Sequence, residues 1–451
     1  MSDLNQKLLS ELEILSAPAR YVVALSGGLD SIVLLHSMAS LRDAGLLKAE
    51  LAAIHVNHQL STAAMDWESF CTETCQQWLV PLTTRKVSVS PDGSLEAAAR
   101  AVRYKVFRDL VRSGDWLLLA HHLDDQIETS LYRFLRGAGP QGLSGIPRMR
   151  ALGNATLWRP FLDFTRADLH SYAVAHRLKW MEDTSNREGL HDRNFLRLDV
   201  LPILERRWPD YRLSWRKSLG LMVESNELQK ELADQDLVSI LSPRGGLFLV
   251  QLKQLNSARQ RNVIRRWAKR LGLLTLGWKI THQLVDEFLP SSGSGSRFDI
   301  VDCLIFCHGG ELLAVHKPSA VRPQPCGFLA SDRLVQLRPQ NGTLSTSQIS
   351  GDGINIKFQK LEVRYRTGSE TLKMRGRPVK SLKDLLREAG MPPWQRQRVP
   401  LIYVESDLIC VPGIGVAECY QAGPGDLGVV IQWQSPQLLI TPERPLAPKV
   451  E

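Results

Sequence analysis

Features that would place the chain in a membrane or outside the cell are absent from its sequence. No apolar run in the 451 residues is long enough to cross a membrane. The first twenty residues contain acidic side chains and lack the basic start and apolar core of a secretory signal. The seven cysteines are too few for a disulfide framework in a chain of this length, and their number is odd. We therefore expect a cytoplasmic protein in a reducing compartment, without contact with a membrane.

Common nucleotide-binding and metal-binding fingerprints are also missing. No G-x4-G-K-[ST] segment occurs, which excludes a Walker A loop, and there is no C-x-x-C pair. Residues 423–428 (GPGDLG) do match G-x-G-x-x-G. A proline stands inside that match and no strand–helix–strand unit surrounds it, so we interpret it as a turn. The C-x3-C pairs Cys71/Cys75 and Cys303/Cys307 favour buried thiols over metal ligands.

Positive charge prevails, with a formal net charge of +9. Residues 259–270 hold six basic side chains and no acidic one, and residues 361–400 hold ten basic and four acidic ones. Clusters of this kind suit a polyanion, because each neutralised phosphate releases a counterion. A solvated helix face explains any single cluster equally well. The presence of clusters in separate regions favours a nucleic acid partner.

Short apolar runs alternate with helical patterns in the first half of the chain. We expect strands at 21–25, 51–56, 82–89 and 116–120, and helices at 1–20, 32–41, 64–78, 95–112 and 121–136. This alternation predicts an α/β domain with a doubly wound parallel sheet over residues 1–215. Ligands of such a sheet bind at the carboxyl ends of its strands. The polar segments 26–31, 55–58 and 121–128 all follow such ends.

The pattern changes at about residue 216. Helices at 218–241 and 257–289, followed by two strands within 297–316, predict a mainly helical domain over 216–320. The segment 291–296 (SSGSGS) predicts a hairpin or a flexible turn. A proline-rich stretch then favours a linker at 321–345. Short strands with one helix at 381–389 predict a small α+β domain over 346–451.

The strongest motif is SGGLDS at 26–31, between the first strand and the next helix. Its glycines allow close approach to phosphate, and N–H groups of the turn and of the helix N-terminus point at negative charge. The hydroxyls of Ser26 and Ser31 can donate to phosphate oxygens. Asp30 would repel phosphate, so we expect it to hold a bridging Mg²⁺. The strand before and the helix after disfavour the alternative of an ordinary capped helix. The predicted phosphate site comprises Ser26, Gly27, Gly28, Leu29, Asp30 and Ser31.

A second polar group follows the fourth strand, at 121–128 (HHLDDQIE). Asp125 and Glu128 are three residues apart and share a helix face. Two carboxylates there could hold an ammonium group or Mg²⁺, or accept a proton from an attacking amine. Acidic capping of the helix N-terminus is the alternative. Zinc is disfavoured, because no second ligand cluster stands out and carboxylates suit harder cations.

Motifs along the whole chain resemble one family. S-G-G-x-D-S is similar to the pyrophosphatase (PP) loop of the N-type ATP pyrophosphatases, which cleave ATP between the α and β phosphates and transfer AMP to an oxygen of the substrate. Six further segments come in the order seen in the tRNA(Ile)-lysidine synthetases, and VRYR…LKDLLREAGMPPWQRQRVPLIY resembles that family's terminal domain. The six are IHVNHQLS (54–61), EAAARAVRY (96–104), AHHLDDQIET (120–129), RGAGPQGLSGIP (136–147), RP (159–160) and DTSN…DRNFLR (183–197).

The resemblance implies an enzyme that uses ATP and Mg²⁺ to join free L-lysine to the wobble cytidine of a minor isoleucine tRNA with a CAU anticodon. The C2 oxygen of the cytidine attacks the α-phosphate, pyrophosphate leaves, and the amine of lysine displaces AMP. Codon reading then changes from AUG to AUA. A homodimer is left open.

The resemblance also assigns residues. Asp125 and Glu128 would handle lysine and catalysis, and the remaining catalytic candidates are His122, Arg100, Arg103 and Arg193. His55 and Asn57 follow the second strand, where such enzymes contact the nucleotide, although a structural histidine is an equal alternative. Trp394 favours a core position over stacking on a base. The tRNA-binding candidates are Arg265, Arg266, Arg364, Arg366, Lys373 and Lys380.

Three rival functions share some of these features. A sulfur-inserting tRNA thiolase has the same loop, but would need a catalytic cysteine or a C-x-x-C cluster. A small-molecule amidating synthetase typically needs an ammonia source and no basic tail. A non-enzymatic tRNA-binding protein would have no use for Asp30 or for the segment 120–129.

Overall fold

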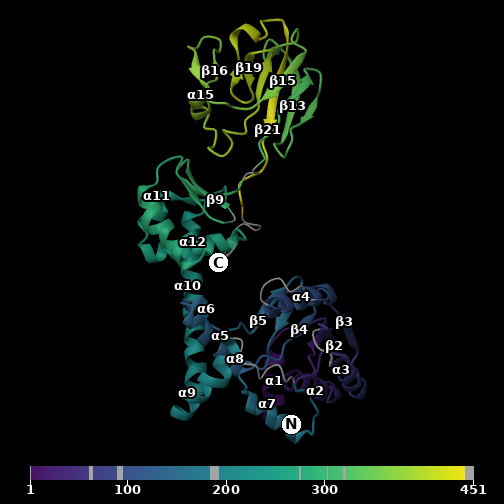
Figure 1. Ribbon diagram of the computed structural model, residues 1–451. Coiled ribbons are helices and arrows are strands. Elements are labelled where there is room, and N and C mark those ends of the chain that lie inside the picture. The colour runs from purple at the N-terminus through teal and green to yellow at the C-terminus, as the bar shows by residue number, and fades with distance from the viewer. Residues whose placement is uncertain are drawn as a thin grey trace. The chain divides into compact units, whose positions relative to one another are not determined.

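A computed structural model describes residues 2–59, 64–88, 95–182, 192–273, 276–301, 303–317 and 321–441 of the chain (Figure 1). The chain forms two compact units, Met1–Leu228 and Gln229–Glu451, which are taken here one at a time. No helix among the described residues is both long and apolar enough to span a membrane.

The first unit is built on a six-stranded sheet of order β3-β2-β1-β4-β6-β5, in which only β5 runs antiparallel to its neighbour. The strands are β1 (Arg20–Ala24), β2 (Glu50–Asn57), β3 (Leu82–Lys86), β4 (Trp116–Leu118), β5 (Met149–Leu152) and β6 (Ala155–Trp158). Every residue of β4 and the middle of β1 are buried, as parallel strands covered on both faces require. The predicted doubly wound α/β domain is confirmed.

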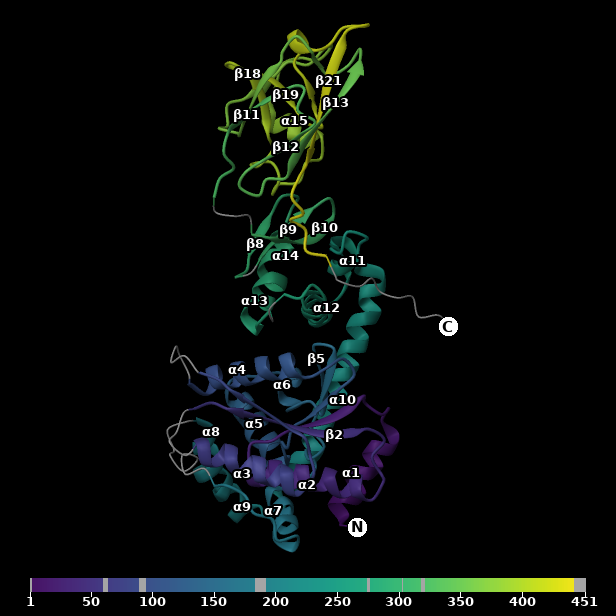
Figure 2. The ribbon, with the colours of Figure 1, turned by 90° about the vertical axis from the view of Figure 1, so that its right-hand side faces the viewer.

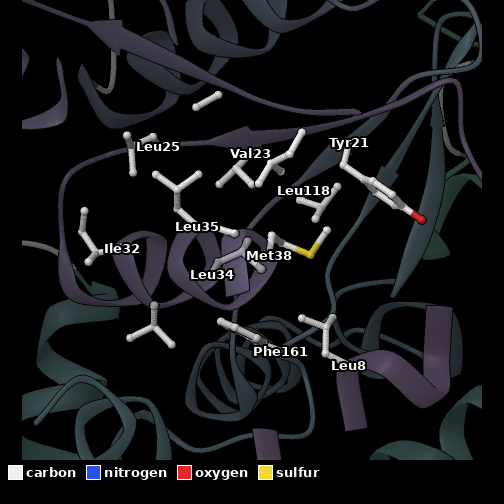
Figure 3. Packing of buried hydrophobic residues seen from close by; sticks show 14 of the residues in the cluster. Leu8, Tyr21, Val23, Leu25, Ile32, Leu34, Leu35, Met38, Leu118 and Phe161 are labelled. Atoms are coloured by element: carbon white, nitrogen blue, oxygen red, sulfur yellow. The ribbon is translucent and has the colours of Figure 1, made fainter. Parts of the chain in front are cut away.

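Helices cover both faces of this sheet. Helices α1, α2, α3 and α7 pack on one face and α4 on the other (Figure 2). Neighbouring residues of β1 point to opposite faces, so Val23 lies in the core under α2 and Val22 in the core with Phe107 of α4. Figure 3 shows Leu35 and Met38 of α2 beside Val23. The helices are α1 (Asp3–Ile14), α2 (Leu29–Asp43), α3 (Ala64–Gln77), α4 (Leu95–Leu110), α5 (Leu123–Leu135), α6 (Pro140–Leu143) and α7 (Arg166–Ala175).

A helical segment after α7 packs on α5. It comprises α8 (Asp192–Phe195), η2 (Leu196–Val200), α9 (Leu201–Arg207) and the start of α10 (Tyr211–Ile240). Leu201 and Tyr211 share an apolar cluster with Ile127 of α5, and the indole N–H of Trp215 donates to Ser130 Oγ at 2.7 Å. These contacts hold α8 and η2 beside α5. Helix α10 begins at residue 211, earlier than the expected 218, and its 30 residues continue into the second unit.

The second unit begins with helices packed on a small sheet of order β7-β10-β9-β8. The expected helix at 257–289 is interrupted, because α12 ends at Arg270 and Gly272 takes a positive φ of 68°. The segment 291–296 joins a helix to a strand, so the hairpin alternative is wrong and the turn is confirmed. The elements are β7 (Leu247–Phe248), α11 (Leu249–Gln254), α12 (Ser257–Arg270), α13 (Trp278–His282), η3 (Gln283–Phe288), α14 (Leu289–Ser291), β8 (Arg297–Asp299), β9 (Cys303–His308) and β10 (Glu311–His316).

The rest of the second unit is mainly antiparallel sheet, with orders β11-β15-β18-β19-β20 and β12-β13-β21-β14 around one core. The expected helix at 381–389 is present as α15. Its elements are β11 (Cys326–Leu329), β12 (Leu334–Gln336), β13 (Thr343–Ser350), β14 (Ile354–Asn355), β15 (Lys360–Arg364), β16 (Thr371–Leu372), β17 (Lys380–Ser381), α15 (Leu382–Glu388), β18 (Leu401–Val404), β19 (Asp407–Val411), β20 (Gly415–Val416), η4 (Glu418–Tyr420) and β21 (Leu427–Gln434).

Two boundaries expected from the sequence need correction. Strands β11 and β12 and the start of β13 lie within 321–345, so that segment is part of the sheets and the linker prediction is wrong there. Proline content suggested a linker, but the buried Phe328 and Leu337 show that the segment supplies core. In addition, the chain returns after β21 to the small sheet. His316 N donates to Leu438 O at 2.8 Å, and Ile440 N donates to Ala314 O at 2.9 Å.

Three smaller predictions are confirmed. Residues 423–426 form a turn before β21. Cys71, Cys75, Cys303 and Cys307 are buried, and none of the four forms a disulfide within the described part of the chain. Trp394 is 7% exposed and packs on Phe306, with ring centroids 5.2 Å apart, so it is a core residue.

Candidate active site

The SGGLDS loop joins β1 to α2, and the helix starts inside the motif at Leu29. Gly28 is the N-cap residue and has no side chain to cap the first turn. The N–H groups at the start of α2 are therefore available to an anion, as the phosphate prediction requires.

Ser31 holds the loop together from within. It is 5% exposed, and its hydroxyl oxygen accepts from the N–H groups of Ser26 and Gly27 at 3.1 and 3.2 Å. The same hydroxyl donates to Gly28 O at 3.0 Å. The expected donation from Ser31 to phosphate is therefore replaced, in this structure, by bonds that shape the loop. Ser26 is exposed and keeps its side chain at the loop surface.

The two glycines answer different needs. Gly27 has a φ of +89°, and a Cβ atom there would lie 3.1 Å from both Cys71 Sγ and Trp67 Cε3. Gly28 has an ordinary φ of −77°. A Cβ atom added at Gly28 would lie 3.7 Å from its nearest neighbour, Ser26 Oγ. The protein itself thus requires glycine at residue 27, and leaves room at residue 28.

The end of β2 supports the loop through buried polar contacts. His55 and Asn57 are 4% and 5% exposed. His55 Nδ1 lies 2.9 Å from Leu25 O, and the Asn57 amide donates to Glu68 Oε2 at 2.8 Å. His55 therefore contacts the residue that precedes the loop, and both side chains have a polar atom bonded to a protein group, which favours the structural alternative for His55.

The N-terminus of α5 gathers the predicted catalytic residues. His122 is the N-cap, and its N–H donates to Asp125 Oδ2 at 3.0 Å. His122 Nε2 lies 3.6 Å from Asp125 Oδ2 and 3.7 Å from Asp30 Oδ2. The carboxyl ends of β1 and β4 thus bring the loop aspartate and the α5 acids together.

Two arginines form hydrogen bonds with the α5 acids Asp125 and Glu128. Arg193 of α8 binds Glu128 Oε2 and Asp125 Oδ1, both at 3.0 Å. Arg197 of η2 binds Glu128 Oε1 at 2.6 Å and Oε2 at 2.9 Å. Glu128 is only 1% exposed. The structure therefore joins the predicted Asp125, Glu128 and Arg193, and adds Arg197. Of the motif 183–197, residues 183–191 lie outside the described residues.

Charge governs the state of the two aspartates. Burial raises the pKa of Asp125, but His122, His121 and Arg193 together outweigh burial and hold it below its usual value. Burial also raises the pKa of Asp30, and the charge of Asp125 adds to this rise while His122 opposes it. Asp30 Oδ1 is buried and has no hydrogen-bond partner among the described residues. An oxygen left in this condition beside a phosphate-type loop fits a cation such as Mg²⁺.

A pocket of 280 Å³ opens next to this group. It carries equal numbers of positive and negative side chains. Its charged lining consists of Arg166, Arg197, Arg212, Asp124, Glu128 and Glu205. Asp124 accepts from Arg212 Nε at 2.7 Å and from the Arg166 N–H at 2.8 Å. Such a pocket suits a ligand that carries both charges, as a free amino acid does.

The predicted Arg100 and Arg103 lie apart from the acids, on α4. Arg100 Nη2 lies 3.4 Å from Tyr104 Oη. Burial lowers the pKa of His58, and Arg103 lowers it further, so Arg103 stands near the end of β2. Within the part of the chain that the structure describes, Arg100 forms no hydrogen bond to Asp125 or Glu128, which are held by Arg193 and Arg197.

Most of the predicted tRNA-binding residues have acidic partners in the second unit. Arg364 pairs with Glu362, Lys373 with Glu418, Lys380 with Glu388, and Arg266 with Asp234. Arg265 and Arg366 form no ion pair among the described residues, and Arg366 Nε is buried without a hydrogen-bond partner there.

Three family profiles match the chain in order. A PP-loop domain covers residues 2–204, a TilS substrate binding domain covers 247–313, and a TilS substrate C-terminal domain covers 361–433. A tRNA(Ile)-lysidine synthase of Coxiella burnetii is 36% identical over 438 residues, which are 96% of this chain and 97% of that protein. The chain belongs to the tRNA(Ile)-lysidine synthase family.

Other members of the lysidine synthase family are about as similar. Those of Nitrosomonas europaea and Serratia proteamaculans are 36% and 35% identical, and cover 93% and 95% of this chain and 93% and 99% of their own lengths. Membership confirms the resemblance drawn from the motifs, and the rival functions are not favoured.

Proposed function

We propose that the chain is a ligase of the cytoplasm that joins free L-lysine to the wobble cytidine of tRNA(Ile) with a CAU anticodon, using ATP and Mg²⁺. The observation that carries the proposal is the meeting of a phosphate-type loop, Asp30 and the α5 acids at one edge of the sheet, in a chain similar to lysidine synthases over nearly its whole length.

The first half-reaction uses the loop. The triphosphate of ATP would lie against the loop and the uncapped start of α2, and the C2 oxygen of the cytidine would attack the α-phosphate with loss of pyrophosphate. Asp30 would hold Mg²⁺, which when bound offsets the negative charge of the phosphates. Arg100 and Arg103 would offset the remaining charge.

The second half-reaction uses the acids and the pocket. Lysine in the pocket would place its carboxylate against the arginines and its ammonium groups against the carboxylates. Asp125 and Glu128, kept fixed by Arg193 and Arg197, would orient the amine that displaces AMP from the cytidine. His122, at 3.7 Å from Asp30 and 3.6 Å from Asp125, would link the two half-sites.

The test is product analysis. Incubation of the purified chain with ATP, labelled lysine and bulk tRNA should give AMP and pyrophosphate, with label in the tRNA(Ile) that has a CAU anticodon. Asp30→Ala serves as the control without adenylation. Formation of ADP in place of AMP would rule the proposal out. So would release of AMP with no transfer of labelled lysine to the tRNA.

A further inference from the structure

A group of arginines surrounds Tyr104 of α4. Arg100 and Arg150 place their Cζ atoms 5.1 and 4.9 Å from the centre of the Tyr104 ring. Arg159, which follows β6, points Nη2 at Tyr104 Oη from 3.5 Å. The three side chains come from α4, from β5 and from the end of β6, so the fold assembles this arginine cluster from separate segments.

Arg159 is the most unusual member, because it is 2% exposed and has no acidic partner among the described residues. Its donors go to neutral groups, with Nη1 bonded to Pro147 O at 2.7 Å and Nε lying 3.3 Å from His121 Nδ1. A buried charge without a counterion is costly. Burial lowers the pKa of Arg159, and the nearby Arg150 and Arg100 lower it further, while Tyr104 opposes this shift.

No carboxylate within the described part of the chain forms an ion pair with Arg100, Arg150 or Arg159. Other arginines of the same unit do have such partners, since Arg193 and Arg197 bind the α5 acids and Arg212 binds Asp124. A cluster of cations without an acidic partner, with one member buried, therefore favours the binding of an anion from outside the cluster.

The cluster borders the acidic site. His121 Nδ1 accepts a hydrogen bond from Arg159 Nε. Burial lowers the pKa of His121, Asp125 opposes this shift, and Arg193 adds to it. The ATP phosphates have their own expected place at the start of α2, where Asp30 Oδ2 lies 3.7 Å from His122 Nε2. The substrate that brings further phosphates close to the reacting cytidine is the polynucleotide itself.

We propose that Arg150 and Arg159 of the arginine cluster bind a backbone phosphate of the RNA next to the reacting base, with the Tyr104 hydroxyl as a further donor, while Arg100 keeps its proposed role at the ATP phosphates. This inference rests on the proposed function and deepens it. Phosphate would supply the missing counterion of Arg159, and the fork of each guanidinium suits its oxygens. The contact would position the anticodon loop over the carboxyl edge of the sheet without reading its sequence.

The experiment compares Arg150→Gln with the wild type and with Arg108→Gln. Arg150 of β5 and Arg108 of α4 are both exposed, but Arg108 forms no hydrogen bond or ion pair among the described residues and serves as the control. Binding of an anticodon stem-loop RNA is titrated at several salt concentrations, and binding of ATP is titrated without RNA. We expect Arg150→Gln to weaken RNA binding about tenfold and to reduce the salt slope by about one, with ATP affinity unchanged. Arg150→Lys should recover part of the affinity, because the charge returns without the fork.

Each contrary result points to a definite alternative. Loss of ATP affinity with normal RNA binding would assign the cluster to the triphosphate. Unchanged affinity and slope for both ligands in Arg150→Gln would overturn the inference. So would an ultraviolet difference spectrum between wild type and Tyr104→Phe showing an ionised tyrosine at neutral pH, since a phenolate would then be the counterion. A wild-type chain that fails to bind the stem-loop or to release AMP would instead count against the proposed function.

Discussion

At the scale of single residues, the two loop glycines separate the needs of the fold from those of the ligand. Gly27→Ala should lower the free energy of unfolding by about 1 to 2 kcal/mol, because alanine is strained at a φ of +89° and its Cβ meets Trp67 and Cys71. Gly28→Ala should leave stability unchanged or slightly raised, yet weaken ATP binding, because the added methyl occupies the space where phosphate must approach. Thermal melting and ATP titration on both variants check this pair. Normal ATP affinity in Gly28→Ala would move the phosphates away from the loop.

Asp30 provides a test with a pH dependence. Because burial raises its pKa in the folded state, the folded chain binds this proton more tightly than the unfolded chain does. Asp30 therefore costs stability as the pH rises from its usual carboxyl pKa, about 4, through the raised value. Asp30→Asn should melt at or above the wild type at neutral pH, with the difference disappearing in acid, and should release no pyrophosphate. Pyrophosphate release at the wild-type rate from the folded variant would remove the Mg²⁺ role.

Substitution of Glu128 should affect both the second half-reaction and the free energy of unfolding. Glu128→Gln should impair lysine transfer more than formation of the adenylated tRNA, since the acid faces the pocket expected to hold the amine. The variant should also unfold more easily, by up to about 3 kcal/mol, because Arg193 and Arg197 lose a buried partner while remaining 32% exposed themselves. Trapping the adenylated intermediate and measuring denaturant unfolding check the two effects. Equal failure at both chemical steps would place Glu128 with ATP instead.

At the scale of elements, the sequence predicted what depends on local pattern. Buried apolar runs marked β1, β2 and β4, and polar segments after them marked the site, because parallel strands end at one edge of a sheet. Arg197 and Arg159 were not predicted. The four-residue spacing of Arg193 and Arg197 was a usable signal, since it puts both on one helix face. Arg159 stands in the RP segment of the family resemblance, but no role was predicted for it, because that role depends on the Pro147 carbonyl and on burial that only the folded chain shows. The linker prediction failed for a similar reason. The prolines at the start of the segment favoured a linker, and the sequence alone did not show that Phe328 and Leu337 are buried in the core.

Helix α12 offers a paired test of the basic clusters. Arg265 is exposed and forms no ion pair among the described residues, whereas Arg266 is neutralised by Asp234, with its Nη2 2.6 Å from the carboxylate. Arg265→Gln should weaken tRNA binding and reduce the salt slope by about one. Arg266→Gln should change the slope less, because that charge is already compensated. Binding titrations at two salt concentrations compare the variants. Equal slopes for wild type and Arg265→Gln would exclude α12 from the tRNA contact.

At the scale of the whole molecule, we expect ATP binding and tRNA binding to depend on different parts of the chain. A truncation that tests this also removes residues 438–440, the returning segment that pairs with the small sheet. A chain ending near Ala320 should keep ATP binding, since the loop lies wholly in the first unit, and should lose most of its affinity for tRNA. Its remaining part of the second unit would also lose Trp394 and Leu439, which pack on β9 and β10. Weak tRNA binding by such a chain would then report lost folding as well as lost contacts.

A shorter deletion separates these effects. A chain ending at Gln434 keeps both C-terminal sheets but lacks Leu438, Leu439 and Ile440. The second unit should lose about 2 to 5 kcal/mol of stability, from apolar area returned to water, while ATP binding is unchanged. A chain ending at Thr441 is the control that retains the segment. Calorimetry that gives identical melting for both deletions would show that the segment adds nothing to stability.

The returning segment also bears on how the chain is made. Residues 438–440 lie beside β10, along the stretch of that strand that β7 leaves open. Residues 438–440 are synthesised more than a hundred residues after β10. During that time this edge of β10 has no pairing partner from the returning segment. Until then the nascent chain offers that edge to chaperones, to proteases or to another copy of itself. Chains that end before residue 438 would keep this edge of β10 unpaired permanently.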